Sequence, residues 1–263
     1  MKLSIITATL NAAEFLPDCI ESVRSQTGEG FVIEHVIADG GSRDDTVAIA
    51  TATGCHVIQG KDKGLFDALN KGTRASNGDV VGCLGADDML MPGAAQAVAR
   101  WYASRTSDWA AGRQLWVDGT GQSLGVTRPP PRWMTPAMYA SLGWSCFDHQ
   151  ATFMTHELFE RLGGFDPDFR YSGDYRLFAH ALARAPFDRI DYTLSRFRQH
   201  GGNASTSGSA RLIEENAIIA REYAPRSKAL RMMYRQGLRV WVNARNPAWF
   251  LGKRLHPEAY GKA

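Results

Sequence analysis

Short apolar runs alternate with amphipathic segments along the first hundred residues. The runs at 2–8, 34–42, 55–60 and 79–86 are rich in Val and Ile and end in polar or glycine turns, which is typical of buried strands. Between them, apolar residues recur at helical spacing after Asn11, in 43–54, in 65–76 and from Pro92 to about Ser104. This repetition predicts an α/β fold with a Rossmann-like, mostly parallel sheet covered by helices on both faces.

The second half of the chain is less regular. A hairpin is expected in 108–125 with its turn near Gly119–Gly121, and the proline-rich segment 128–136 is expected to be a linker or a lid. A strand and a short helix follow in 149–169, then a helix from Asp174, an alternating strand over 187–200 and a helix over 210–224. The chain closes in a basic helical extension.

Polar clusters follow the strands of the first half, at Thr7–Asn11, Asp39–Ser42, Gly60–Gly64 and Gly85–Asp88. Ligands of parallel sheets bind beyond the carboxyl ends of the strands. We therefore expect one site on this rim. Adjacent carboxylates after a buried strand, Asp87 and Asp88, would repel each other there unless a cation or hydroxyl groups face them.

Composition is ordinary for a globular protein with a real core: 263 residues, 44% hydrophobic and 22% charged, with a net charge of +3. The charge is unevenly placed, because residues 226–263 contain nine Lys and Arg and one acid, a local charge of +8. Four cysteines without a CxxC pair indicate free thiols. The first residues are unlike a signal peptide and no run is long enough to span a bilayer, so we expect a cytoplasmic protein.

Six segments in order carry a family resemblance: "TATLNAAEFL", "IADGGSRDDT", "DKGLFDALNKG", "GDVVGCLGADD", "HQATFMTHELFERLGGFD" and "SGDYRLF". In this order and spacing they resemble the family-2 glycosyltransferases of the GT-A fold, over roughly residues 2–205. The subgroup it is similar to builds bacterial surface polysaccharides from nucleotide-diphospho-sugars with inversion. The resemblance implies a nucleotide-sugar-binding half at 1–105, an acceptor and catalytic-base half at 106–205, and the basic extension at 206–263.

The resemblance also implies roles for the rim residues. Asp88 corresponds to the metal ligand for Mn²⁺ or Mg²⁺, and Asp87 to a group near the ribose and sugar hydroxyls. Residues that correspond to the base and ribose site are Asp39, Gly40, Gly41, Thr7, Thr9, Asn11 and Glu14. Helix capping is the alternative for Asn11, for Ser42 and for the Asp87–Asp88 pair.

The loop 60–64 and the helix after it provide further candidates for the donor. Asp62 and Lys63 lie where a helix begins, and a helix N-terminus beside a lysine favours phosphate. Asp67, Asn70 and Lys71 share one face of that helix, although Lys71 read alone is a solvated surface charge. The expected donor is a UDP, dTDP or GDP sugar.

The transfer needs a base to accept the proton of the acceptor hydroxyl. The resemblance places this base at Asp174, where a helix cap is the alternative, and Gly173 stands where the family often has a glutamate. His149 and Gln150 correspond to the acceptor side, with a structural histidine as the alternative. His200 corresponds to a contact with metal or diphosphate, or else simply ends a strand. The processive QxxRW signature is absent, so single-sugar transfer is expected.

In the basic extension, Arg231, Arg235 and Arg239 recur at i+4, while Leu230, Met233, Tyr234, Leu238 and Trp241 form another face. Such a helix either binds an anionic membrane, near a glycan or lipid-linked glycan acceptor, or packs on the catalytic domain. No nucleic-acid-binding motif is present. Two other functions stay open: a sugar nucleotidyltransferase, and an inactive nucleotide-sugar-binding subunit that recruits partners to a membrane.

Overall fold

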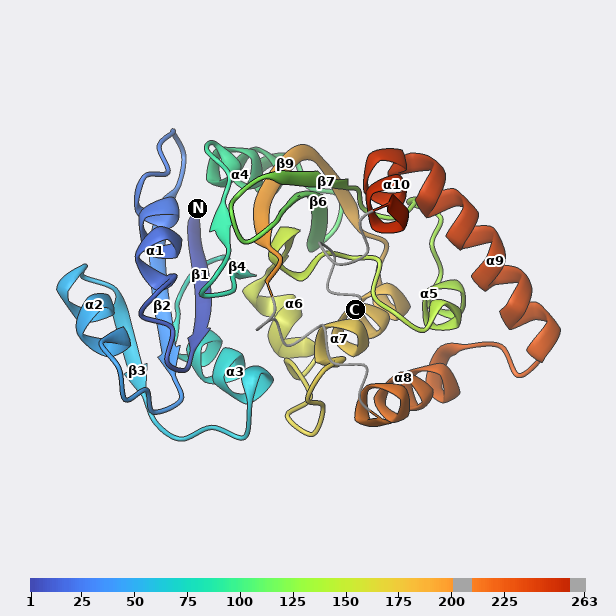
Figure 1. Cartoon of the computed structure of the whole chain (residues 1–263), viewed down its shortest axis with the longest axis horizontal. Coiled ribbons are helices and arrows are strands. Elements are labelled where there is room, and N and C mark those ends of the chain that lie inside the picture. The colour runs from blue at the N-terminus through green and yellow to red at the C-terminus, as the bar shows by residue number, and fades with distance from the viewer. Residues whose placement is uncertain (201–209, 256–263) are drawn as a thin grey trace.

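A computed structural model describes residues 1–200 and 210–255, and the predicted boundary at 205/206 lies outside them. The first half alternates strands and helices as the hydrophobic pattern predicts (Figure 1). The elements of this half are β1 (Lys2–Thr9), α1 (Leu16–Arg24), β2 (Val32–Asp39), α2 (Thr46–Ala52), β3 (His56–Gln59), α3 (Leu65–Ala75), β4 (Val80–Cys83), β5 (Met89–Leu90) and α4 (Ala94–Ser104).

The second half continues the same sheet. Its elements are β6 (Trp109–Val117), β7 (Ser123–Thr127), α5 (Pro136–Leu142), the 3-10 helix η1 (His149–Ala151), β8 (Thr152–Thr155), α6 (His156–Arg161), α7 (Gly173–Arg184) and β9 (Asp188–Arg198). The predicted hairpin is present, since β6 and β7 pair antiparallel and the backbone N–H of Asp118 donates to Gln122 O at 2.9 Å. Prolines 129–131 are buried in the connection to α5.

One sheet joins the two halves, in the strand order β3-β2-β1-β4-β8-β6-β9-β5, with β7 on β6. Strands β1 to β4 of the first half run parallel, as predicted. Beyond β4 the pairing is mixed, because β8 is antiparallel to both β4 and β6 whereas β9 is parallel to β6. The fold is the GT-A type that the resemblance implies, and neither half has a sheet of its own.

Two hydrophobic cores occupy the two faces of the sheet. Alternation along the strands divides them: Leu3 and Ile5 of β1 face α1, α2 and α4, while Ile6 faces α3 and α7. The second core is the more aromatic and centres on Trp109, whose ring lies 5.0 Å from the Phe147 ring centroid. Helices therefore cover both faces, which leaves the strand ends as the accessible edge.

The extension consists of α8 (Ala210–Tyr223), α9 (Lys228–Arg245) and α10 (Pro247–Leu255). Helix α9 packs on α5, with Leu238 and Val242 buried, and α10 lies against β7 (Figure 1). The apolar face expected from the sequence is thus divided, since Leu238 points to the domain whereas Met233 is 60% exposed. Among the described helices, none is long and apolar enough to cross a membrane.

The capping alternatives are wrong for the first two helices. Helix α1 begins at Leu16 after Phe15 and has no side-chain cap, because Asn11 lies five residues earlier with a left-handed φ of 52°. The Asn11 Oδ1 accepts instead from the Arg43 backbone N–H at 2.9 Å. Helix α2 begins at Thr46, and Ser42 bonds Asp39 and the Asn11 backbone rather than capping it.

Candidate active site

The carboxyl ends of β1, β2 and β4 lie on one edge of the sheet, where Thr9 pairs with Asp39 in parallel register. Asp39 is 2% exposed, and its carboxylate accepts from Thr9 Oγ1 at 2.9 Å and from the Gly41 and Ser42 backbone N–H groups at 3.0 and 2.8 Å. Burial alone would raise its pKa, but these hydrogen bonds outweigh burial and lower it. Asp39 is therefore a fixed anion at the rim.

Loop 60–64 reaches the same place through Asp62. A Cβ on Gly40 would lie 2.5 Å from Asp62 Oδ2, so the Asp62 carboxylate would have to move if Gly40 carried a side chain. Asp62 Oδ1 accepts from the Gly64 backbone N–H at 3.0 Å and orders the start of α3, where no side chain caps the helix. Lys63 is exposed beside this helix N-terminus.

Several predicted donor residues lie away from the rim or have other partners. Thr7 is fully buried and bonds His35 Nε2 at 3.0 Å. Asp67 pairs with Lys71 at 2.9 Å along α3. Asn70 uses its amide on the backbone of Phe165, donating at 2.7 Å and accepting at 2.9 Å. Thr7 therefore joins β1 to β2, and Asn70 holds the 163–165 turn, while the predicted roles of Thr7, Asp67 and Asn70 in donor binding stay predictions.

Asp88 lies at the centre of the site and is 1% exposed. Its Oδ2 accepts from Gln150 Nε2 at 2.8 Å, and its Oδ1 accepts from the Arg198 backbone N–H at 2.9 Å. Burial and then the neighbouring Asp87 raise its pKa well above the usual range. The capping alternative is wrong for this pair as well, because α4 has Gly93 at its N-cap and no side-chain cap.

Strand β9 brings His200 to the same cluster, with Nε2 2.9 Å from Asp87 Oδ2. The His200 ring stacks on the Phe15 ring, with 5.2 Å between the ring centroids. The Arg198 guanidinium lies 5.2 Å from the Phe15 ring centroid and forms an ion pair with Asp18 at 3.0 Å. The end of β9 is thereby joined to the start of α1. Sequence reasoning missed Phe15 and Arg198, and only a pairing of distant strands could have indicated them.

The side chains gathered here suit a divalent ion that is held partly by the protein and partly by a bound ligand. Within 1–200 and 210–255, no group of three or more His, Cys, Asp and Glu side chains is arranged to enclose a metal alone. Asp87, Asp88 and His200 nevertheless form one linked cluster that combines excess negative charge with an imidazole. Mg²⁺ commonly takes one or two carboxylates and completes its shell with phosphate oxygens and water, so these residues fit a metal that arrives with a diphosphate.

Gln150 and His149 have different surroundings. Gln150 Oε1 accepts from Gln114 Nε2 at 3.0 Å, so a buried polar chain supports the contact with Asp88. The His149 ring lies edge-on to Phe165 at 5.3 Å, and its Nε2 is buried without a hydrogen bond from the described residues. Burial lowers the pKa of His149 to about 4, so the ring is neutral. A histidine whose buried ring nitrogen lacks a partner among these residues is not a satisfied structural histidine, and the acceptor-side role of His149 stays a prediction.

Asp174 stands in the first turn of α7, after Ser172 at the N-cap. The side-chain cap expected as the alternative is absent, and Asp174 Oδ1 accepts from the Tyr175 backbone N–H at 2.8 Å. Burial raises the pKa of Asp174 to about 6. Gly173 is required by packing, since a Cβ there would lie 2.5 Å from the Phe66 ring, which explains why no glutamate precedes Asp174.

A second carboxyl group, Asp148, lies close enough for Asp174 to influence it. Burial, and to a lesser degree the charge of Asp174, raise the pKa of Asp148 to about 7, while Thr127 Oγ1 donates to its Oδ2 at 2.5 Å. The sequence pattern did not single this residue out, because an aspartate in an irregular loop carries no spacing signal.

Asp148 lines a pocket of about 520 Å³ between the β6–β7 hairpin, the 144–148 loop and the helices α9 and α10. Aromatic side chains of Trp116, Trp144 and Phe250 share this pocket with Arg128, Arg239 and Asn243. An apolar hollow with a few polar groups beside a titratable pair is the usual form of a small-molecule site. We call it the α9 pocket.

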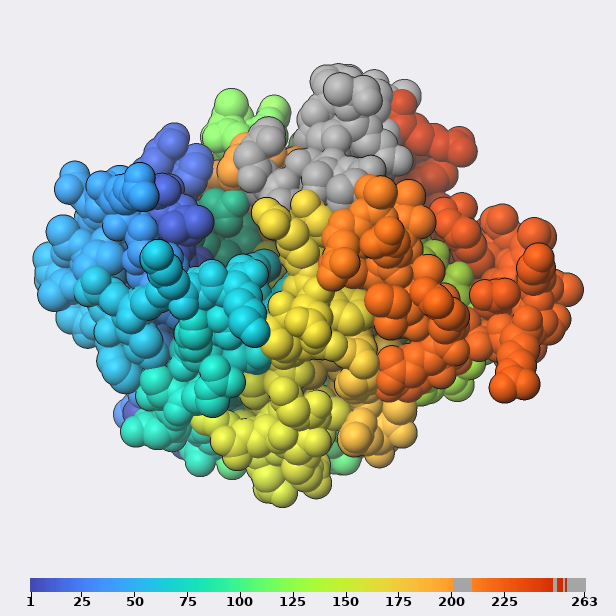
Figure 2. All heavy atoms as spheres, turned by 90° about the horizontal axis from the view of Figure 1, so that it is seen from below, coloured from blue at the N-terminus to red at the C-terminus, as the bar shows by residue number. Residues whose placement is uncertain are grey.

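Surfaces from all three parts of the chain meet around this site. Figure 2 shows α3 in cyan, the segment around 160–175 in yellow and α8 in orange lying side by side on one face. Glu14 is exposed on the loop before α1, on the donor side of the rim. Thr9, Asp39, Gly40, Gly41, Asp62, Asp87, Asp88, Gln150 and His200 are the predicted residues that the fold gathers along the strand ends.

Comparisons with known proteins agree with this geometry. An uncharacterised glycosyltransferase of Mycobacterium tuberculosis (strain H37Rv) is 32% identical over 189 residues, which is 68% of this chain and 68% of that protein. Staphylococcus aureus TarS (residues 1–349) in complex with UDP-GlcNAc superposes with a TM-score of 0.68 at 16% identity, over 99% of this chain and 82% of that one. A Pyrobaculum calidifontis mannosyltransferase in complex with GDP-Man and Mn²⁺ superposes with a TM-score of 0.56 at 17% identity, over 97% and 87% of the two chains.

The family model described as "Glycosyl transferase family 2" matches residues 4–163, which contain the ends of β1, β2 and β4 and the Asp87–Asp88 pair. More than half of the chain lies within this match. The chain therefore belongs to glycosyltransferase family 2.

Proposed function

We propose that this glycosyltransferase is an inverting, metal-dependent enzyme that transfers a single sugar from a nucleotide-diphospho-sugar to a glycan or lipid-linked glycan in bacterial surface-polysaccharide synthesis. The observation that carries the proposal is the buried Asp88, paired with Asp87 and bonded by Gln150 and Arg198 at the strand ends. A buried like-charge pair is stabilised by a cation, and a nucleotide diphosphate needs one.

The donor side is formed by the rim of the sheet. Asp39 and Thr9 with the backbone of Gly40 and Gly41 hold the nucleoside, and Asp62 and Lys63 lie at the N-terminus of α3, where phosphate is favoured. Asp87, Asp88 and His200 are the groups that hold Mn²⁺ or Mg²⁺, which supplies charge neutralisation for the departing diphosphate. UDP, dTDP and GDP sugars all fit this description.

The acceptor side is the α9 pocket. A sugar ring stacks well on aromatic faces, and Trp116, Trp144 and Phe250 provide them beside Asp148. Asp174 accepts the proton of the acceptor hydroxyl as its oxygen attacks the anomeric carbon from the face opposite the diphosphate, which inverts the centre. A raised pKa matches this task, because a base with a pKa near the working pH both stays ionised and attracts the proton.

Attachment to the inner face of the membrane is part of the same proposal. From Lys228 to Leu255 the sequence has seven Lys and Arg and no acid. Met232, Met233 and Val240 of α9 are 64%, 60% and 70% exposed. An apolar helix face flanked by cations suits a surface of anionic lipid.

A screen of nucleotide sugars by thermal shift, with and without Mn²⁺, tests the donor side. The correct donor should raise Tm in proportion to the logarithm of its excess over Kd, and only with metal. Asp88→Ala should remove both this metal-dependent shift and turnover; if both survive, the proposal is wrong. Release of a nucleoside diphosphate is expected, whereas release of pyrophosphate would indicate a nucleotidyltransferase.

A further inference from the structure

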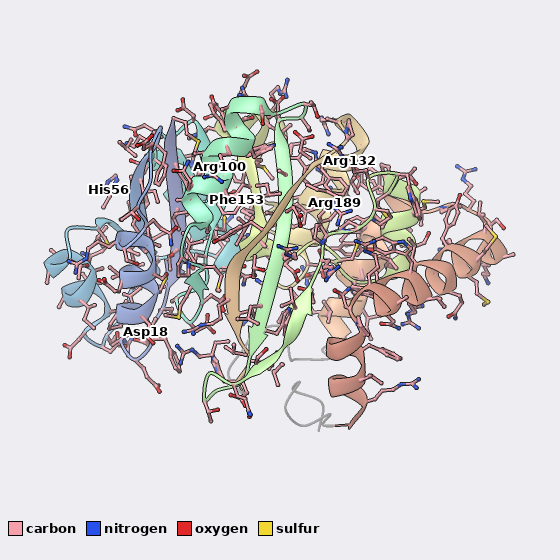
Figure 3. All side chains as sticks on the ribbon, turned by 90° about the horizontal axis from the view of Figure 1, so that it is seen from above. Asp18, His56, Arg100, Arg132, Phe153 and Arg189 are labelled. Carbon is pink, nitrogen blue, oxygen red and sulfur yellow. The ribbon has the colours of Figure 1, made fainter. Side chains whose placement is uncertain are left out.

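Five arginines surround a second pocket of about 440 Å³, far along β6 and β9 from the Asp88 cluster. Four separate segments contribute them: Arg113 from β6, Arg128 and Arg132 from the proline-rich connection, Arg189 from β9 and Arg245 from the end of α9. In Figure 3, Arg132 and Arg189 lie next to each other on this side of the sheet, with Arg100 of α4 nearby. We call it the arginine pocket.

Acidic partners neutralise only part of this charge. Arg113 pairs with Asp191 at 2.8 Å, although the Asp191 side chain is 96% exposed, and Arg132 pairs with Asp188 at 2.9 Å. Arg128, Arg189 and Arg245 have no ion pair with an acid in the part of the chain that the structure describes. Five arginines against these two aspartates leave a net charge of +3.

Gathering unpaired cations is unfavourable without an anion. Burial lowers the pKa of Arg189, and the nearby charges of Arg245, Arg132 and Arg128 lower it further, against the opposing effect of Asp191. The same argument applied with opposite sign to Asp87 and Asp88, where a cation relieves the repulsion. Guanidinium groups bind phosphate oxygens through paired, planar hydrogen bonds, so several of them around one hollow favour phosphate over a single halide or carboxylate.

We propose that the arginine pocket is a binding site for a diphosphate or a closely spaced pair of phosphates, separate from the donor site. The net charge of +3 matches a diphosphate near neutral pH better than a single phosphate dianion. Arg245 of the pocket lies over the Trp241 ring at 5.3 Å, and Trp241 lies edge-on to Trp133 at 6.4 Å, so aromatic surface borders the pocket. A phosphate attached to an apolar or sugar group would find contacts for both its parts.

Calorimetric titration with inorganic pyrophosphate, in EDTA and 150 mM salt, tests the site without metal at the donor rim. The matched variants are Arg189→Gln/Arg245→Gln, which lie in the arginine pocket, and Arg221→Gln on the exposed face of α8. Wild-type protein and Arg221→Gln should bind pyrophosphate equally, and the double variant at least tenfold more weakly. The double variant should stay folded without ligand, with a Tm close to that of the wild type, because the lost contact of Arg245 with the Trp241 ring and the removed repulsion oppose each other.

Wild-type protein that does not bind pyrophosphate, or a double variant within twofold of it, would overturn the proposal. Vesicles distinguish the phosphate's source. Co-sedimentation with phosphatidylcholine containing phosphatidic acid that depends on Arg189 and Arg245 assigns a lipid headgroup, and pyrophosphate binding without such co-sedimentation assigns a soluble diphosphate. Neither result depends on sugar transfer.

Discussion

At the scale of single residues, three aspartates on the same rim have opposite electrostatic surroundings. Hydrogen bonds from backbone and hydroxyl groups keep the pKa of Asp39 low, whereas burial raises the pKa of Asp88 and of Asp174. A carboxylate whose oxygens are fully bonded is a fixed binding group, and one with few donors can accept a proton or a cation. These environments match the proposed division of the three aspartates into a binding group, a metal ligand and a base.

The pH dependence of turnover follows from Asp174. With its pKa raised to about 6, the base is protonated and inactive below that pH and ionised above it. We expect kcat/KM to rise with pH through about 6 and to level above 7. A pH profile at constant ionic strength measures this, with Asp174→Glu as a variant that keeps a carboxyl group. A flat profile between pH 5 and 7 would exclude Asp174 as the base.

Neutral substitutions distinguish Asp174 from Asp148. Asp174→Asn should lower kcat by about 10²–10⁴-fold, the usual contribution of a general base, and leave donor binding intact. Asp148→Asn should lower it much less, because Asp148 lines the acceptor pocket and already accepts from Thr127. If Asp148→Asn lowers the single-turnover rate more than Asp174→Asn does, Asp148 is the base and Asp174 is not.

The same variants have a predictable effect on stability. A raised pKa means that the folded protein binds more protons than the unfolded chain between about pH 4 and 6, so stability falls as pH rises through that window. Asp174→Asn removes this loss. Its Tm should exceed that of the wild type at pH 7.5, by about 2–4 °C for each kcal/mol recovered, and should match it at pH 4.

At the scale of elements, α8 of the C-terminal extension holds the helix that carries the base. Glu215 is 1% exposed, and its carboxylate accepts from the backbone N–H groups of Arg170, Tyr171 and Ser172 at 2.7, 2.9 and 2.9 Å. Burial would raise its pKa, but these bonds outweigh it and lower the pKa. Glu215 thus accepts hydrogen bonds from the backbone N–H groups just before α7.

Glu215→Gln tests this positioning role. The amide keeps the shape but loses the charge-assisted bonds, so we expect a loss of about 1.5–3 kcal/mol in the free energy of unfolding and a lower kcat with little change in donor Kd. The adjacent Glu214→Gln is a matched control, because Glu214 is exposed and its ion pair with Arg211 is long, at 4.0 Å. Equal denaturation midpoints for the two variants would contradict the role of Glu215.

Sequence periodicity predicted the elements well where one local pattern decides them. The parallel strands, the hairpin and the start of α7 each depend on neighbouring residues, and so do the polar rims of β1, β2 and β4. The contacts that the sequence did not predict join residues far apart along the chain. Thr7 meets His35, Asn70 meets Phe165 and Asp88 meets Arg198, across separations of 28, 95 and 110 residues that no spacing along the chain reveals.

At the scale of the whole molecule, the two predicted halves and the extension depend on one another. Strand β8 lies between β4 and β6, and β5 of the first half pairs only with β9. The α9 pocket is likewise built from both the second half and the extension. The proposed donor and acceptor sites therefore lie on one sheet but have different walls, so changes to the extension should affect the acceptor alone.

Replacing Trp144 by alanine tests that separation. Trp144 lines the α9 pocket opposite Val242 and Asn243, so its loss should raise the acceptor KM about tenfold while the donor KM and kcat change less than twofold. Trp133→Ala removes an exposed indole outside the pocket and should leave both KM values unchanged. If Trp144→Ala instead weakens donor binding, or if the acceptor KM is unaffected, the acceptor lies elsewhere on the rim. A pocket wall remote from the reacting atoms binds the substrate and the transition state equally well, so its loss raises KM and leaves kcat unchanged. A raised acceptor KM at constant kcat is therefore more informative than a loss of activity.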